Sequence, residues 1–272
     1  MANMRILRKD LIRLADGYSA SPSLVPSMGA DIAQLDDRQV TRTTSTASQD
    51  INYIWGSNQT MNMVAVCRHN WSDSATLRLR RYSDTAMSSL IDDSTALDAY
   101  NAGLLPSPYD IADDRFRGLK LTVFYLANAT NVKALKLTIA DASNPAGYMQ
   151  HARVLAGQYF ETTYNPPTKA NVKFVTASKV KRVDGGGRVG DQRGTWRELD
   201  IGLAWVPDAD YDDLSAIAIY HDSVKSTFVS LYPGAGTAEE LLNQMWCGID
   251  DLGPFEQAFV GIKSLPLTLG EM

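Results

Sequence analysis

Cysteine and histidine are scarce in this 272-residue chain, which holds two of the first and three of the second. Cys67 and Cys247 lie in apolar or aromatic surroundings, VAVCRH and QMWCGI, and not in a C-x-x-C spacing. We therefore expect two buried thiols, with a disulfide as the less favoured alternative. His69, His151 and His221 have no ligand partners at the usual spacings. A zinc site would have to be assembled wholly in three dimensions, so no metal site is predicted.

Long apolar runs are also missing. No run approaches the ~20 residues that a membrane helix needs. Charged residues interrupt the N-terminal stretch MANMRILRKDLIRLADG before it could form a signal-peptide core, so we expect a protein made and kept in a cytoplasm, without membrane insertion. The net charge is −5, with 26 basic and 31 acidic residues interspersed. Such a chain has little to attract phosphate backbones, and nucleic acid is not an expected partner.

No motif specifies a reaction. Gly185, Gly187 and Gly190 fit G-x-G-x-x-G, but the following DQRGTWRELDIGL indicates a turn and a strand where a dinucleotide site requires a helix. The aspartates of 208–213 resemble the start of a calcium loop, yet Ile219 stands where an EF-hand has its glutamate. These aspartates favour a helix N-terminus, with a different kind of calcium site as the alternative. We predict no enzyme, no catalytic residue and no cofactor; a hydrolase built from scattered Asp and His residues is the third hypothesis.

Alternation of apolar and polar residues is the strongest positive feature. It predicts β-hairpins at Met61–Tyr82, Leu119–Ile139 and Ala216–Leu231. Ten or so short strands, separated by turns, favour a mainly β protein with a β-sandwich or jelly-roll architecture. We expect an N-terminal arm and loop over residues 1–35 and one β domain over 36–272, with a subdivision near 140–150 as the second choice. Ser83–Asp114 loses the alternation and predicts an inserted loop with a short helix near Ser89–Tyr100.

Two groups of residues are candidates for binding. Trp71 stands in a polar corner with Asn70 and Asp73, where an exposed ring could stack on a sugar; a buried Trp that plugs the end of the sandwich is the favoured alternative. The N-terminal arm carries apolar side chains that could dock on a neighbouring subunit. These candidate assembly contacts are Met4, Ile6, Leu7 and Leu11.

Several segments together resemble minor tail or tail-tip proteins of long-tailed bacteriophages, whose β-sandwich is similar to galactose-binding and carbohydrate-binding jelly rolls. The segments are VAVCRHNWSDSATLRLRRYSD, ARVLAGQYFETTYNPP, the turn VDGGG, RGTWRELDIGLAWV, FVSLYPG and LPLTLGEM. The 83–114 excursion departs from the short corner that the pattern would have. The resemblance implies a structural role in the virion tail, after synthesis in the host cytoplasm, and carries over no functional residue.

Two functions follow as hypotheses. The first is a minor tail or distal tail adaptor that mediates tail-tip assembly, binding other tail proteins and forming a homo-oligomeric ring or tip. The second is a carbohydrate-binding module that contacts glycans of the host surface through Asn70, Trp71 and Asp73.

Overall fold

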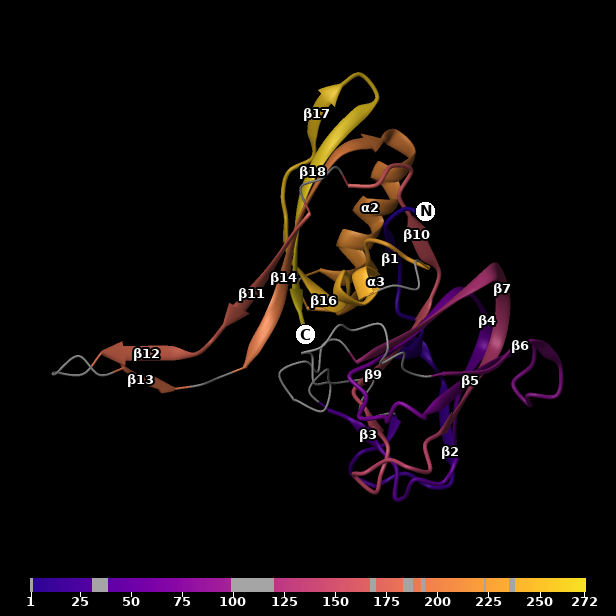
Figure 1. Cartoon of the computed structure of the whole chain (residues 1–272). Helices are drawn as coiled ribbons and strands as arrows, with labels where there is room; N and C mark the ends of the chain where they lie inside the picture. The colour runs from indigo at the N-terminus through magenta and orange to yellow at the C-terminus, as the bar shows by residue number, and fades with distance from the viewer. Residues whose placement is uncertain are drawn as a thin grey trace.

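The protein is mainly β, as the sequence predicts, and its strands form two large antiparallel sheets (Figure 1). The computed structural model describes residues 2–30, 39–98, 120–166, 170–182, 188–191, 194–222, 224–234 and 238–272. Within these residues, neither α-helix is long and apolar enough to cross a membrane.

The elements fall into a larger sheet, a smaller sheet and two short ribbons. The larger sheet has the order β10 (Tyr159–Glu161), β1 (Arg5–Leu7), β15 (Thr227–Ser230), β16 (Gln244–Leu252), β18 (Ile262–Glu271), β14 (Thr195–Pro207), β11 (Asn171–Thr176), with β17 (Glu256–Phe259) on β18. The smaller sheet has the order β2 (Gly17–Ser21), β4 (Gln49–Cys67), β7 (Leu121–Ala140), β5 (Thr76–Tyr82), β6 (Leu90–Asp98), with β9 (Arg153–Gly157) on β4. The ribbons pair β3 (Thr41–Arg42) with β8 (Gln150–His151) and β12 (Lys179–Arg182) with β13 (Arg188–Asp191). The helices are the 3₁₀ turn η1 (Ile12–Leu14), α2 (Asp208–His221) and α3 (Ala238–Leu242).

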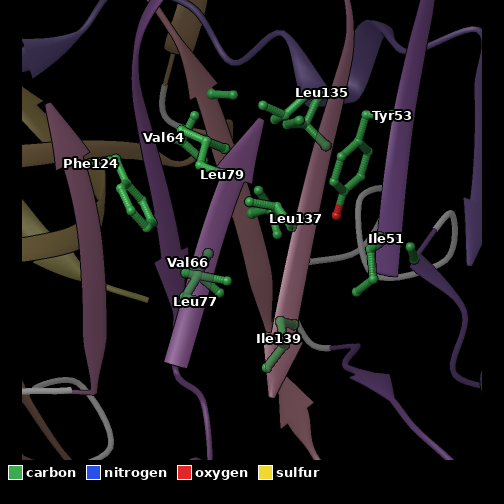
Figure 2. Packing of buried hydrophobic residues seen from close by; sticks show 14 of the residues in the cluster. Ile51, Tyr53, Val64, Val66, Leu77, Leu79, Phe124, Leu135, Leu137 and Ile139 are labelled. Atoms are coloured by element: carbon green, nitrogen blue, oxygen red, sulfur yellow. The ribbon is translucent and has the colours of Figure 1, made fainter. Parts of the chain in front are cut away.

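The smaller sheet folds over on itself to make a β-sandwich. The first part of β4 pairs with β2, whereas its last part, Met63–Cys67, pairs with β9. Register shifts after Ile54 and after Met61 separate the two parts, as β-bulges do where a strand bends. Side chains from both layers meet in one core, where Val64 and Val66 lie opposite Leu77 and Leu79 (Figure 2).

The larger sheet is buried on both faces near its centre. Met245, Cys247 and Ile249 of β16 point to one side, where α2 adds Leu214 and Ile217. The intervening Trp246 points to the other side. There it joins a third cluster, which also holds Leu7 and Phe228 of the larger sheet and Met63, Ala65 and Cys67 of the sandwich. The two sheets therefore pack against each other through this shared hydrophobic cluster.

The N-terminal segment differs from the expected arm. β1 lies between β10 and β15 in the larger sheet. The apolar residues of β1 and those beside it are buried, with exposed fractions of 0% for Met4, 2% for Ile6, 0% for Leu7 and 6% for Leu11. The physical reason is that the consecutive apolar residues Ile6 and Leu7 give this short strand a buried side chain on each face of the sheet. The four candidate assembly contacts are therefore core residues of their own chain.

Two of the three predicted hairpins are extended but pair differently from the prediction, and the third is helical over its first part. β4 and β5 both pair with β7 and not with each other, because the corner between them carries the chain across the sandwich. The segment Leu121–Ala140 is one strand of 20 residues, and the polar stretch within it lies at the bend. At 216–231 the helix α2 precedes β15, because the aspartates at its start favour a helix of 14 residues.

The excursion at 83–114 is partly described. The helix expected near Ser89–Tyr100 is instead the strand β6, which pairs antiparallel with β5. Two ion pairs join the two strands: Arg78–Asp93 at the exposed edge, and Arg81–Asp92, in which the Arg81 side chain is buried. Residues 99–119 lie outside the described part of the chain.

A buried ion pair ties the N-terminal segment to the sandwich. Arg153 Nη2 lies 2.7 Å from Asp10 Oδ2, and the two side chains are 0% and 1% exposed. The other carboxylate oxygen of Asp10 accepts a hydrogen bond from the Ile12 amide at 3.0 Å. Removal of one partner would leave the other charge buried and uncompensated, which costs far more than the pair itself contributes.

We therefore expect Arg153→Ala to lower the free energy of unfolding by about 3–5 kcal/mol. Equilibrium urea unfolding followed by tryptophan fluorescence measures the change. Arg78→Ala is the matched control because its partner, Asp93, forms an ion pair at the exposed edge of the smaller sheet, and its effect should be much smaller. Equal effects of the two substitutions would contradict the assigned role of the buried pair.

Candidate functional site

The polar corner that the sequence singles out is not an exposed aromatic platform. Trp71 is 4% exposed, and its ring stacks on that of His69 with the centroids 4.2 Å apart. His151 meets the same indole edge-on at 6.2 Å. This is the buried plug at the end of the sandwich, which the sequence favours as the alternative. A sugar ring cannot stack on Trp71 in this structure.

The other two corner residues have different surroundings. The Asn70 side chain holds neighbouring loops together: its Nδ2 donates to the Tyr148 carbonyl at 3.1 Å, and its Oδ1 accepts from the Gln150 amide at 2.7 Å. Asp73 is exposed. The corner therefore brings together one stacked ring, one structural amide and one solvated carboxylate.

All three histidines are buried and are held toward the neutral form. Burial lowers the pKa of His69 to about 3, with smaller contributions from Lys120 and His151. Burial also lowers the pKa of His151 to about 4, and it lowers that of His221. A hydrogen bond of 3.2 Å joins His69 Nε2 to Thr122 Oγ1. These rings act as packing groups inside the protein.

The described residues contain no assembled site for metal binding or for thiol chemistry. No group of three or more His, Cys, Asp or Glu side chains converges there as a metal site would require. Cys67 and Cys247 are buried free thiols, as the sequence predicts, and burial raises the pKa of the Cys247 thiol. A thiol in such surroundings is a poor nucleophile.

The two loop motifs of the sequence have structural partners. The aspartates at the start of α2 bind within the chain: Asp208 pairs with Lys263 at 2.8 Å, Asp213 with Arg8, and Asp210 accepts from Thr163. Gly190 lies in β13, and a strand follows it in place of the helix that a dinucleotide site requires. Gly185 and Gly187 lie outside the described residues.

An open groove runs along the edge strand β2. Its volume is about 430 Å³, and Asp16, Tyr18, Ser19, Ser23 and Leu24 contribute to its walls. β2 pairs with β4 over five residues, from Gly17 opposite Ile54 to Ser21 opposite Asp50. The pairing holds β2 on β4 at the edge of the smaller sheet (Figure 1).

The polar side chains of the groove are oriented by bonds to the sandwich. Asp16 Oδ2 accepts a hydrogen bond of 2.6 Å from the Gly56 amide. Ser19 Oγ accepts one of 3.0 Å from Asn52 Nδ2. Tyr18 donates its hydroxyl to the Ile12 carbonyl at 2.8 Å, and its ring meets Tyr53 edge-on at 5.6 Å. Asp16, Tyr18 and Ser19 are thus each held by a bond to another part of the chain; the Tyr18 ring packs partly against the sandwich core, and Ser19 points to the other face of β2.

The groove is absent from the predicted sites because the sequence predicts an arm and loop over residues 1–35, which include β2. The overlooked signal is the short alternation Gly-Tyr-Ser-Ala-Ser of residues 17–21, which forms β2. Two other hollows fit a ligand less well. The apolar gap between α2 and the sheet measures only about 10 Å³, and a shallow hollow of about 190 Å³ beside Lys9 and Tyr220 is partly bridged by the Arg8–Asp213 ion pair.

Comparisons with known proteins concern the fold alone. Neither a family model nor a curated protein matches this chain. Among solved structures, a CBM32 module from Clostridium perfringens in complex with GalNAc-β-1,3-galactose is 14% identical, with a TM-score of 0.38 over 55% of this chain and 99% of that module. A chitosan-binding module of a Paenibacillus sp. IK-5 chitosanase/glucanase is 14% identical, with a TM-score of 0.37 over 54% and 98%. The lectin domain of lectinolysin, complexed with Lewis B antigen, is 13% identical, with a TM-score of 0.39 over 55% and 96%.

The chain is thus similar to carbohydrate-binding β-sandwiches over somewhat more than half of its length. Identities and TM-scores this low transfer neither a ligand nor a site residue. None of the matches places the chain in the bacteriophage tail family that the sequence resembles.

The buried histidines give a prediction for stability. Their pKa values are lower in the folded protein than the ordinary 6.5, to about 3 for His69 and about 4 for His151. Between those values and 6.5 the unfolded chain binds more protons, so stability falls as pH falls through this window. Each of these two histidines should lower the free energy of unfolding by about 1–2 kcal/mol as the pH falls from 7 to about 5. Urea unfolding at both pH values measures the loss, and NMR titration of the imidazoles is the check; imidazole pKa values near 6.5 would contradict the prediction.

Proposed function

We propose that the protein is a non-catalytic binding protein that takes a small glycan in the β2 groove. The observation that carries the proposal is the combination of a groove of about 430 Å³ with Asp16, Tyr18 and Ser19 on a fixed strand. Ligand sites usually measure roughly 300–1,000 Å³, so the groove suits one or two sugar rings.

The chemistry of the groove matches a polyhydroxylated ligand. A carboxylate accepts about four hydrogen bonds, so the bond from Gly56 leaves Asp16 with capacity for sugar hydroxyls. The Ser19 hydroxyl both donates and accepts. The Tyr18 ring adds apolar surface of the kind that the C–H face of a sugar contacts. Charge, hydroxyl and ring together favour a neutral or cationic saccharide over an anionic one.

The groove also has the rigidity that binding needs. Each polar side chain is already held by a partner from the sandwich, Gly56 for Asp16 and Asn52 for Ser19. Ordering a side chain at the moment of binding costs about 0.5–1.5 kcal/mol, and side chains that are already fixed avoid much of this cost.

Asp16→Asn should weaken glycan binding by about tenfold or more, because a hydrogen bond to a charged group contributes about 1.5–3 kcal/mol. The Asn side chain keeps one oxygen to accept from Gly56, so the fold should persist. A glycan array selects the ligand, and isothermal titration calorimetry measures its affinity for each variant. Asp73→Asn is the matched control, since it neutralises an exposed carboxylate at the Trp71 corner.

Two results would contradict this proposal. One is a folded wild-type protein that binds no glycan on the array. The other is the reversed pattern, in which Asp73→Asn abolishes binding and Asp16→Asn leaves it intact, because that pattern would locate the site at the corner.

The second candidate function is a structural component of a bacteriophage tail, made in the host cytoplasm and then incorporated into the virion beside other tail proteins. One observation favours an assembly role: β12 and β13 form a ribbon that projects away from both sheets (Figure 1). All four β12 residues are exposed, so the ribbon contributes little to the core of its own chain. Segments of this kind commonly stabilise assemblies by docking on a neighbour.

A tail role predicts that peptides of this chain are present in stoichiometric amounts in density-purified virions from source cells. Quantitative peptide mass spectrometry measures them against known capsid proteins. A host cytoplasmic protein of similar abundance is the control for carry-over. Absence from the virions, with the chain abundant in the lysate, would rule out the tail role and leave glycan binding as the function to test.

A further inference from the structure

The projecting ribbon carries positive charge on an acidic protein. Residues 171–191 hold five basic and two acidic residues, a net charge of +3, whereas the whole chain has −5, so the rest of the chain carries −8. Lys179, Lys181 and Arg182 are exposed near its end. Apolar side chains are exposed along it as well, with 66% of Phe174 and 52% of Val180 accessible. This combination of charge and apolar surface is typical of a docking segment and costly to leave solvated without a partner.

The larger sheet offers an acidic face beside the root of the same ribbon. Leu199 and Ile201 of β14 point into the core, so Glu198 and Asp200 point to the opposite side. Asp250 of β16 alternates in the same way with the core residue Ile249 and is exposed. We call Glu198, Asp200 and Asp250 the acidic face. Lys173 forms ion pairs with Asp200 and, at 3.4 Å, with Glu198. This single lysine offsets only part of the negative charge of the acidic face.

Glycines bring the carboxylates of the acidic face close together. Register places Glu198 beside Gly270, and Gly270 beside Gly248, in one row across β14, β18 and β16. The Asp250 carboxylate lies directly over Gly270, where any larger side chain would collide with it. Burial raises the pKa of Asp250, and the negative charge of the nearby Glu198 adds to the rise.

We propose that the protein associates head to tail, with the basic β12–β13 tip of one copy docked on the acidic face of the next. Tip and face lie on different parts of the molecule, so the contact is heterologous and each copy keeps one unused tip and one unused face. Repetition then gives a closed ring or an open filament. The three tip cations meet a face of three carboxylates and the one lysine, Lys173, that pairs with two of them, which leaves the face a net charge of −2. Such charge complementarity sets register and speeds association.

This inference deepens the assembly role by naming the partner as a second copy, and it can be tested without virions. The tip variant combines Lys179→Glu, Lys181→Glu and Arg182→Glu. The face variant combines Glu198→Lys and Asp250→Lys. A control for the face variant, Asp73→Lys with Asp98→Lys, makes the same change in net charge, +4, at exposed positions of the sandwich. Sedimentation velocity at about 1–100 µM and low salt measures assembly, and circular dichroism checks folding.

The wild type and the control variant should associate, and association should weaken as salt screens the charges. On its own, each variant should remain monomeric, because its tip and its acidic-face positions then carry charges of the same sign and repel each other. An equimolar mixture of the two should associate again, since an acidic tip meets a basic face and a basic tip meets an acidic one.

The proposal is overturned by a wild type that stays monomeric throughout, by association that survives in both variants, or by a mixture of folded variants that fails to associate. A wild type that binds a DNA duplex through the tip, without self-association, would likewise overturn it in favour of a polyanion partner. If only the virion experiment fails, the head-to-tail contact stands and its biological setting changes; if only this experiment fails, the tail role keeps another partner.

Discussion

The position of β1 between β10 and β15 is the constraint on which the rest of the structure depends. Three apolar residues at the start of the chain reach both faces of the larger sheet: Met4 and Ile6 face the α2 side, and Leu7 faces the sandwich. A few residues later, the Asp10–Arg153 pair connects the same segment to β9. The N-terminus thus joins the two sheets, and the shared cluster around Trp246 holds them at a fixed spacing.

That arrangement decides which surfaces remain available. Near the middle of the larger sheet, α2 covers one side and the sandwich covers part of the other, so the surfaces left for binding are the edges and the acidic face on β14 and β16. One edge is β2 with its groove, and another is the ribbon that continues from β11 and β14, at a different end of the molecule (Figure 1). Glycan binding and head-to-tail association can therefore occur in the same copy, because neither surface covers the other.

The sequence predicted the composition of the core better than its connections. Alternation correctly indicated a mainly β protein, because side chains on successive residues point to opposite faces whatever the partner strand is. Pairing depends on contacts far apart in sequence, and no local signal distinguishes one bent strand of 20 residues, such as Leu121–Ala140, from a hairpin. The same limit hid β1, whose three residues are too few to show a period.

The candidate sites illustrate a related limit. Trp71, Asn70 and Asp73 are neighbours in sequence, yet burial against His69 removes the ring from solvent, and only the fold reveals this. The groove residue Asp16 is oriented by Gly56, which lies 40 positions away. A site built from distant partners leaves little trace in the local pattern, whereas the buried thiols could be predicted because their flanking apolar residues are local.

The most direct test of the central claim is an amide chemical-shift map of the protein titrated with the glycan of highest affinity. Binding in the groove predicts that the largest shifts cluster at residues 16–24 and at the β4 residues paired with them, and that the corner around Trp71 stays unchanged. Shifts concentrated at residues 69–75, or none at saturating glycan, would contradict the proposed site.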